Sequence, residues 1–184
     1  MSESLADEIF ATFGSDEDQK SNRITQDTVK EWMSSIDIDT LGALHAALQN
    51  TNNQKRIYPS LDFDNYQKFV LSYLGRCISE NPDSEWASTR YEAGWEAVSW
   101  FLNLWRNTSA PHSALSRTKE WLESLYRSGD VTVRECIVNA TLEHLFEKPE
   151  IAQYFIDWKN DSVLSAGYHQ ALDWSKKGGK SDLE

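Results

Sequence analysis

Apolar residues recur at helical spacing along almost the whole chain. Leu5, Ile9 and Phe13 predict a first helix that ends at Gly14. No segment alternates between apolar and polar residues over a convincing length, so strands are not expected. We therefore predict an all-α fold, a multi-helix bundle of about eight or nine helices. The same spacing predicts further helices over Val29–Ile36, Ile38–Leu48, Phe63–Cys77, Leu115–Tyr126, Val133–Phe146, Ile151–Trp158 and Leu164–Leu172.

The stretch Glu85–Arg106 carries four of the eight tryptophans and predicts a central, buried helix. On a helix its apolar residues fall on two opposite sides, which leaves only a narrow polar strip. Because both sides must then be packed, we expect Trp95→Ala to cost about 3–5 kcal/mol of stability. The two apolar sides are Tyr91, Trp95, Val98, Leu102 and Trp105, and Trp86, Ala93, Ala97, Trp100 and Leu104.

Boundary signals separate these predicted helices. Thr28–Glu31 and Thr132–Glu135 both match the capping box that begins a helix. The polar stretch Gln49–Tyr58, closed by a proline, predicts a loop, and Pro149 suits the first position of a helix. We expect residues 1–184 to form a single domain with a point of subdivision near 107–112, and residues 176–184 to form a frayed tail.

The charge of the chain is strongly negative, with 18 basic and 29 acidic residues and a net charge of −11. The excess lies in the first half, where Met1–Glu92 holds 16 acidic and 8 basic residues. Nucleic-acid binding is not expected, because phosphate contacts need clustered lysine and arginine. An acidic surface instead favours encounter with a basic partner, although it also serves solubility alone.

The composition also bears on the compartment. No apolar run approaches the length of a membrane span, and the first ten residues carry acidic groups where a secretion signal needs basic ones. Cys77 and Cys136 are too few for a disulfide framework. We expect a cytoplasmic protein that does not bind membranes.

The chain offers little that resembles a catalytic or metal site. Asp37–Gly42 begins like a calcium loop, but the twelfth position is Leu48, where a glutamate is required. We interpret these aspartates, like those of Asp62–Asp64, as carboxylates at helix N-termini, which the helix dipole favours. Cys136 and His144 share a predicted helix but lie eight residues, or about 12 Å, apart. Nucleotide-binding, zinc and serine-hydrolase motifs do not occur. We therefore predict no cofactor, no metal and no enzymatic activity.

Acidic residues are the remaining candidates for function. Such clusters often form only a solvated surface, but they can also surround the contact with a basic partner. The residues that we select as a partner-binding surface are Asp16, Glu17, Asp18, Asp37, Asp39, Asp62, Asp64, Glu85, Glu92 and Glu96.

The last third of the chain, residues 126–174, resembles a family of small bacterial all-helical proteins whose members beside secreted-toxin genes are regarded as immunity proteins. Residues 130–134 are also similar to the turn and second helix of a HEAT repeat, so helical pairs are expected in the second half. No functional residue carries over from either resemblance. The residues that carry the family resemblance are Gly129, Asp130, Val133, Arg134, Leu142, Glu143, Pro149, Phe155, Trp158 and Trp174, with a looser likeness at Arg90–Ala93.

Charge, missing motifs and this resemblance lead to one functional hypothesis with two alternatives. The first is an immunity protein that binds and neutralises a basic bacterial toxin domain, such as a nuclease, through an acidic helical surface. The second is a helical scaffold or adaptor that binds a protein or peptide and neutralises no toxin. The third is an enzyme whose polar pocket converges on Cys136, Glu143 or His144. The oligomeric state does not follow from the sequence.

Overall fold

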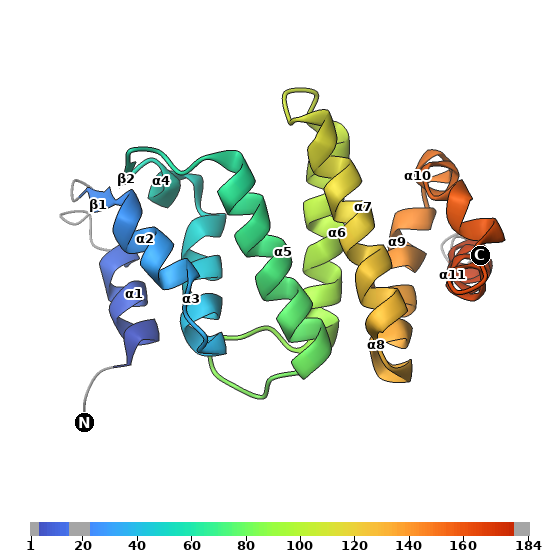
Figure 1. Ribbon diagram of the computed structural model, residues 1–184, viewed down its shortest axis with the longest axis horizontal. Helices are drawn as coiled ribbons and strands as arrows, with labels where there is room; N and C mark the ends of the chain where they lie inside the picture. The colour runs from blue at the N-terminus through green and yellow to red at the C-terminus, as the bar shows by residue number, and fades with distance from the viewer. Residues whose placement is uncertain (1–3, 15–22, 179–184) are drawn as a thin grey trace. The chain divides into compact units, whose positions relative to one another are not determined.

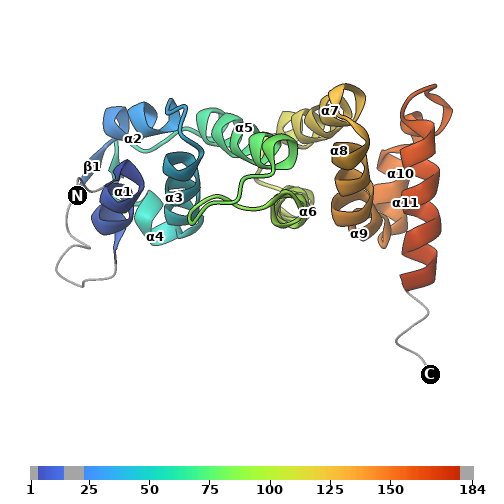
Figure 2. The ribbon, with the colours of Figure 1, turned by 90° about the horizontal axis from the view of Figure 1, so that it is seen from below.

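The chain forms two compact helical units, unit 1 over Met1–Thr89 and unit 2 over Arg90–Glu184. The computed structural model describes residues 4–14 and 23–178. The predicted all-α fold is confirmed, since helices dominate both units (Figures 1 and 2). The two units divide after Thr89, whereas residues 107–111 only connect two consecutive helices of unit 2.

Unit 1 is built around a pair of parallel helices that begin at the same end (Figure 1). These are α1 and α3, and α5 packs against the other side of α3. Two short strands also pair in parallel, with Ile24 opposite Ile57, although no strand was predicted. Each strand has only two residues, which is too short to produce an alternating pattern. The elements are α1 (Leu5–Phe13), β1 (Ile24–Thr25), α2 (Gln26–Met33), α3 (Ile38–Gln49), α4 (Thr51–Gln54), β2 (Ile57–Tyr58) and α5 (Phe63–Glu80).

The beginnings of the helices show where the capping predictions were right and wrong. Asp37 and Asp62 cap α3 and α5 by accepting hydrogen bonds from backbone N–H groups three residues on, which satisfies otherwise unpaired donors. The predicted capping boxes were wrong, because Thr25 caps α2 and Asp130 caps α8. Thr25 lies three residues before the predicted Thr28, and Asp130 lies two residues before the predicted Thr132. Both have the extended backbone that is typical of a cap residue. The segment predicted as a loop, Gln49–Tyr58, contains α4 and β2.

Unit 2 contains a continuous helical segment that changes its winding part-way. Residues Ile137–Leu142 form π-helical turns between α8 and α9. Gly94 of α6 crosses this segment so closely that a Cβ on it would lie 2.7 Å from the Ala140 Cβ. The Thr141 hydroxyl donates to the Gly94 carbonyl oxygen at 3.0 Å. The helices are α6 (Arg90–Arg106), α7 (His112–Ser128), α8 (Val131–Cys136), α9 (Glu143–Phe146), α10 (Pro149–Tyr154), the 3₁₀ helix Ile156–Asn160 and α11 (Ser165–Gly178).

Two boundaries in unit 2 refine the sequence predictions. Pro149 occupies the first turn of α10, as its fixed φ favours. The helix α11 continues to Gly178, so residues 176–178 are helical and not a frayed tail. The rest of the predicted tail lies outside the described residues.

The prediction for the tryptophan-rich stretch was wrong in two respects. Its helix, α6, begins at Arg90, so Glu85 and Trp86 precede it. The buried residues of α6 are Ala93, Gly94, Ala97 and Phe101. Ala93 and Ala97 belong to one of the two predicted sides, whereas Trp95 on the other predicted side is 51% exposed. Small residues allow the close crossing with the π-helical turns. They lie about a quarter turn around the helix from the predicted side that contains Tyr91 and Trp95. All eight tryptophans lie in the described residues, and only Trp32 and Trp158 are buried.

Stability should therefore depend on Phe101 and not on Trp95. Phe101 is fully buried against Trp105, Tyr154 and Phe155. We expect Phe101→Ala to lower the free energy of unfolding by about 3–5 kcal/mol through the cavity it leaves. Trp95→Ala should change it by less than about 1 kcal/mol. Urea unfolding monitored by circular dichroism measures both, and equal losses would contradict the assignment.

A charged contact links α7 to the start of α11. The Arg127 guanidinium donates to Asp161 at 2.6 Å and to Glu123 at 2.9 Å. The Asp161 carboxylate also accepts hydrogen bonds from the backbone N–H groups of Val163 and Leu164. The Arg127 hydrogen bond is the main reason that the pKa of Asp161 falls to about 2.

This lowered pKa predicts an acid-dependent loss of stability. The charged form of Asp161 is favoured in the folded state, so its contribution is complete above the unfolded pKa of about 4 and disappears as the pH falls through about 2. Asp161→Asn should thus lower the urea midpoint at pH 7 and make progressively less difference between pH 4 and pH 2. Asp173→Asn, on the exposed surface of α11, is the control at pH 7. A constant difference at every pH would refute the linkage.

Candidate functional site

Four segments of unit 1 meet at one end of that unit, which we call the acidic end. They are the beginnings of α1 and α3, the last turn of α5 and the segment 81–89 (Figure 1). Arg76 of α5 donates to the Ile36 carbonyl oxygen at 2.9 Å, and the Trp86 backbone N–H donates to the Asp39 carboxylate at 3.3 Å. These two contacts join α5 and the segment 81–89 to the beginning of α3.

The acidic end is distinguished by its charge. Residues 4–14, 37–49 and 81–89 contain six carboxylates and neither lysine nor arginine. The nearest cation in α5, Arg76, is already held by Glu80 at 2.6 and 3.0 Å. The negative potential here is therefore not balanced within these segments. The six carboxylates of these three segments are Asp7, Glu8, Asp37, Asp39, Asp83 and Glu85.

Three of the predicted site residues come together at this end. Asp37 accepts hydrogen bonds from the Thr40 hydroxyl at 2.6 Å and its backbone N–H at 2.9 Å. The hydroxyl contact is the main cause of the lowered pKa of Asp37. Asp39 holds the Trp86 backbone, and Glu85 is exposed beside it. Asp37 and Asp39 thus combine a structural contact with a charge at the surface.

The other predicted site residues do not join this group. Asp62 and Asp64 lie at the beginning of α5, a helix of 18 residues or about 27 Å from the Arg76–Glu80 end. The pKa of Asp62 is lowered chiefly by the Asn65 backbone N–H. Glu92 and Glu96 belong to α6 of unit 2. The last three, Asp16, Glu17 and Asp18, lie outside the described residues.

The segment 81–89 is fastened to the helices of unit 1 at several points. Its Ser88 N–H donates to the Tyr73 hydroxyl at 2.9 Å, and burial raises the pKa of Tyr73. The Trp86 carbonyl packs directly on Gly42, where an added Cβ would lie 2.2 Å from its oxygen. Asn81 turns the chain out of α5 with a left-handed φ of 49°. The position of Trp86 is consequently set by backbone contacts.

Aromatic side chains lie among the carboxylates of the acidic end. Phe10 of α1 is 59% exposed, and its ring centroid lies 5.0 Å from that of the half-buried Trp86. Ile36, next to Asp37, is 91% exposed. We call Phe10 and Trp86 the aromatic pair. An apolar contact area surrounded by charges is the usual composition of a protein interface.

Sequence reasoning missed this pair. Phe10 lies about 100° around α1 from Ile9, so it falls outside the predicted stripe of Leu5, Ile9 and Phe13. An aromatic residue beside this stripe, two residues after Glu8, was the available signal. Trp86 carried no such signal, because the pattern placed it in the following helix.

The residues considered for catalysis are engaged elsewhere. Cys136 is fully buried, donates to the Arg90 carbonyl oxygen at 3.2 Å, and has a pKa raised to about 11 by burial. His144 contacts Glu147 at 3.2 Å. A buried thiol with a raised pKa is a poor nucleophile. No group of three or more potential metal ligands occurs in the described residues.

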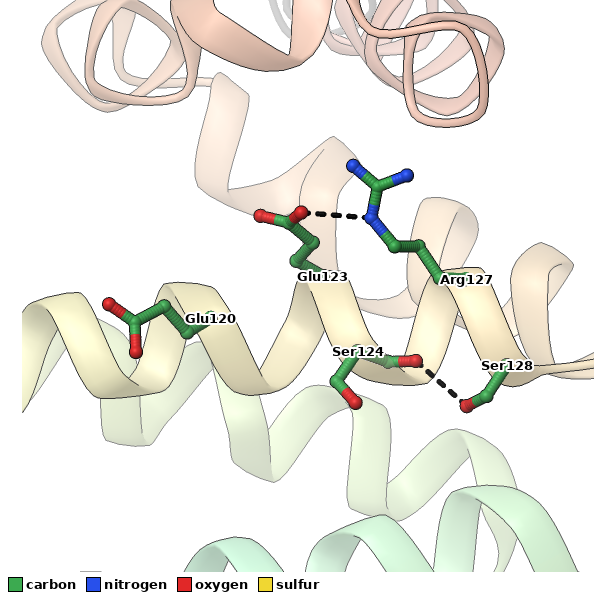
Figure 3. Close-up of a pocket in the computed structure, with 5 residues that line it drawn as sticks. All are labelled: Glu120, Glu123, Ser124, Arg127 and Ser128. Atoms are coloured by element: carbon green, nitrogen blue, oxygen red, sulfur yellow. Dashed lines mark hydrogen bonds and ion pairs between the residues drawn. The ribbon is translucent and has the colours of Figure 1, made fainter.

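The described part of unit 2 contains a hollow of about 550 Å³ along α7 (Figure 3). Its lining residues mostly bond to one another. Arg127 is held by Glu123, and the Ser128 hydroxyl donates to the Ser124 carbonyl (Figure 3). Glu120 accepts from Ser116. Few polar groups here remain to orient a ligand, so the hollow is a weaker candidate than the acidic end.

Comparisons of this chain with protein-family models, with curated proteins and with solved structures find no match. In the described residues, no helix combines the length and the apolar character that crossing a membrane requires. The functional argument therefore depends on the geometry and charge of the acidic end.

The attachment of Trp86 to α3 yields a direct test. Gly42→Ala places a methyl group against the Trp86 carbonyl, so we expect a loss of about 1–3 kcal/mol in the free energy of unfolding. Ser72→Ala, an exposed position in α5, should stay within about 0.5 kcal/mol of the unaltered protein. Urea denaturation compares the two, and a fully stable Gly42→Ala protein would show that the close approach does not exist.

Proposed function

We propose that this protein is an immunity protein that binds and neutralises a basic bacterial toxin domain at the acidic end of unit 1. The observation that carries the proposal is the meeting of three segments with six carboxylates and no lysine or arginine. A nuclease domain is one suitable partner, because it needs a positive surface to hold nucleic acid. Covering that surface would block access of its substrate.

Electrostatics supports such a partner in two ways. Unbalanced carboxylates raise the association rate with a basic protein and suppress association with acidic ones. The exposed Phe10 and Ile36 supply apolar contact area within the charged surface. Fast association suits an inhibitor that must capture a toxin before it acts.

The resemblance of residues 126–174 to immunity-associated helical proteins supports a toxin as the partner. These residues belong to unit 2. Among them, Asp130 caps the start of α8 and Trp158 is buried, so these two act in capping and packing. The resemblance thus suggests the class of protein, while the charge of unit 1 suggests the contact surface.

A helical adaptor without toxin neutralisation is the second candidate. It is favoured by a separate exposed surface on unit 2, where Tyr91 and Trp95 of α6 are 43% and 51% exposed. Two units with one exposed aromatic surface each could hold two partners together. Protection of cells from a toxin distinguishes this candidate from the first.

The proposal predicts that the charge of the acidic end controls association. Glu8→Gln, Asp83→Asn and Glu85→Gln together remove three exposed charges and leave Asp37 and Asp39 in place. We expect this triple variant to bind the toxin encoded by the neighbouring gene about tenfold more slowly. Surface plasmon resonance measures the rate, and survival of cells that express the toxin measures neutralisation.

The matched control removes three exposed charges from unit 2, with Glu135→Gln, Glu150→Gln and Asp173→Asn. It has the same net charge as the first variant, so an equal effect would show that only total charge matters. Failure to form a complex, or a complex insensitive to salt between about 0.05 and 0.5 M, would refute the proposal.

A further inference from the structure

We infer that the aromatic pair, Phe10 and Trp86, receives an arginine side chain of a basic partner. This inference rests on the proposed binding at the acidic end and names the contact at its centre. The pair combines an exposed ring, at 59% for Phe10, with a neighbour held by the backbone contacts of Asp39 and Gly42. Such a preformed contact loses little conformational entropy on binding.

Two other exposed aromatic rings of the chain are already covered by a cation of the chain itself. Arg23 lies 5.2 Å from the ring centroid of Tyr58, which is 65% exposed. Lys177 lies 5.6 Å from the ring centroid of Trp174, which is 47% exposed. Within the described residues, the Phe10 ring has no such cation. As far as the described residues show, a position for a cation on this ring is not filled by the chain itself.

The charges around the pair favour the same occupant. Asp7 lies three residues before Phe10 on the same side of α1, and the exposed Glu85 precedes Trp86. A guanidinium group can stack on an aromatic ring while it donates to a carboxylate, because it is planar and carries five N–H donors. A lysine ammonium group can do one of these well, but not both in the same geometry.

The same charges disfavour other occupants. A second copy of this chain would bring its own carboxylates against these, which costs free energy. Phosphate groups, whether of nucleic acid or of a lipid surface, would meet three segments without a lysine or arginine. The second exposed aromatic surface, Tyr91 and Trp95, lies in a stretch where Arg90 accompanies Glu92 and Glu96, so positive and negative charges are mixed there.

The test uses the full chain and two peptides of equal charge, tetra-arginine amide and tetra-lysine amide. Two-dimensional ¹H–¹⁵N NMR follows the indole N–H signal of Trp86, which Trp86→Phe identifies by its loss. We expect tetra-arginine to shift this signal and to bind about two- to fivefold more tightly than tetra-lysine. Tetra-glutamate should produce no shift.

Two variants and a matched control locate the contact. Phe10→Ala should weaken tetra-arginine binding about fivefold, and Glu85→Gln should weaken it about twofold. Both residues are exposed, so both proteins should fold, and the NMR spectrum itself verifies this. Trp95→Ala removes an aromatic residue of similar exposure from unit 2 and should leave binding unchanged.

The inference is overturned if tetra-lysine binds as tightly as tetra-arginine, or if Trp95→Ala weakens binding more than Phe10→Ala does. Its failure is distinct from failure of the proposed function. If the protein neutralises toxin but tetra-arginine does not shift the Trp86 signal, the proposed function is supported and the arginine contact is refuted. If the protein shows the shift but does not protect cells, the arginine contact is supported and the proposed toxin neutralisation is refuted.

Discussion

The arrangement of the candidate site depends on the missing side chain at Gly42. Without a Cβ on this residue, the Trp86 carbonyl can lie directly against α3, and the backbone N–H of Trp86 can donate to the Asp39 carboxylate. These contacts hold the segment 81–89 against a helix, so Trp86 meets Phe10 and Glu85 stands near the carboxylates of α3. Unit 2 contains a similar close approach at a glycine, because Gly94 lets α6 approach the π-helical turns closely. In both units a helix glycine determines which surfaces can meet.

This constraint links packing to the proposed function. Carboxylates at helix N-termini are stabilising in themselves, because they satisfy free N–H groups and oppose the helix dipole. When two helices begin at the same end of a unit, these stabilising groups also accumulate into a surface charge. Asp37 illustrates both effects, since Thr40 satisfies its capping role while the carboxylate stays exposed. The binding surface is thus a consequence of how unit 1 begins its helices.

Helix periodicity proved sufficient for most of the fold. The spacing of Leu5, Ile9 and Phe13 located α1, and the apolar spacing within α3, α5 and α7 located those helices as well. The prediction failed for α6, which has apolar residues around most of its circumference. There the choice of the buried side depended on size, since only Ala93, Gly94 and Ala97 permit the close crossing. Hydrophobicity alone favoured Trp95, which solvent reaches.

The sequence by itself determined the helical class, the negative charge and the capping carboxylates Asp37 and Asp62, because these follow from local spacing and composition. It did not determine which carboxylates would share a surface. Asp62 and Asp64 lie at the beginning of a helix, as Asp37 and Asp39 do, but the length of α5 separates them from the acidic end. Only the tertiary structure placed Trp86 against Phe10, because that contact joins residues far apart in the chain through a backbone approach at Gly42. Such an approach leaves no periodic signal, since it depends on the absence of one side chain.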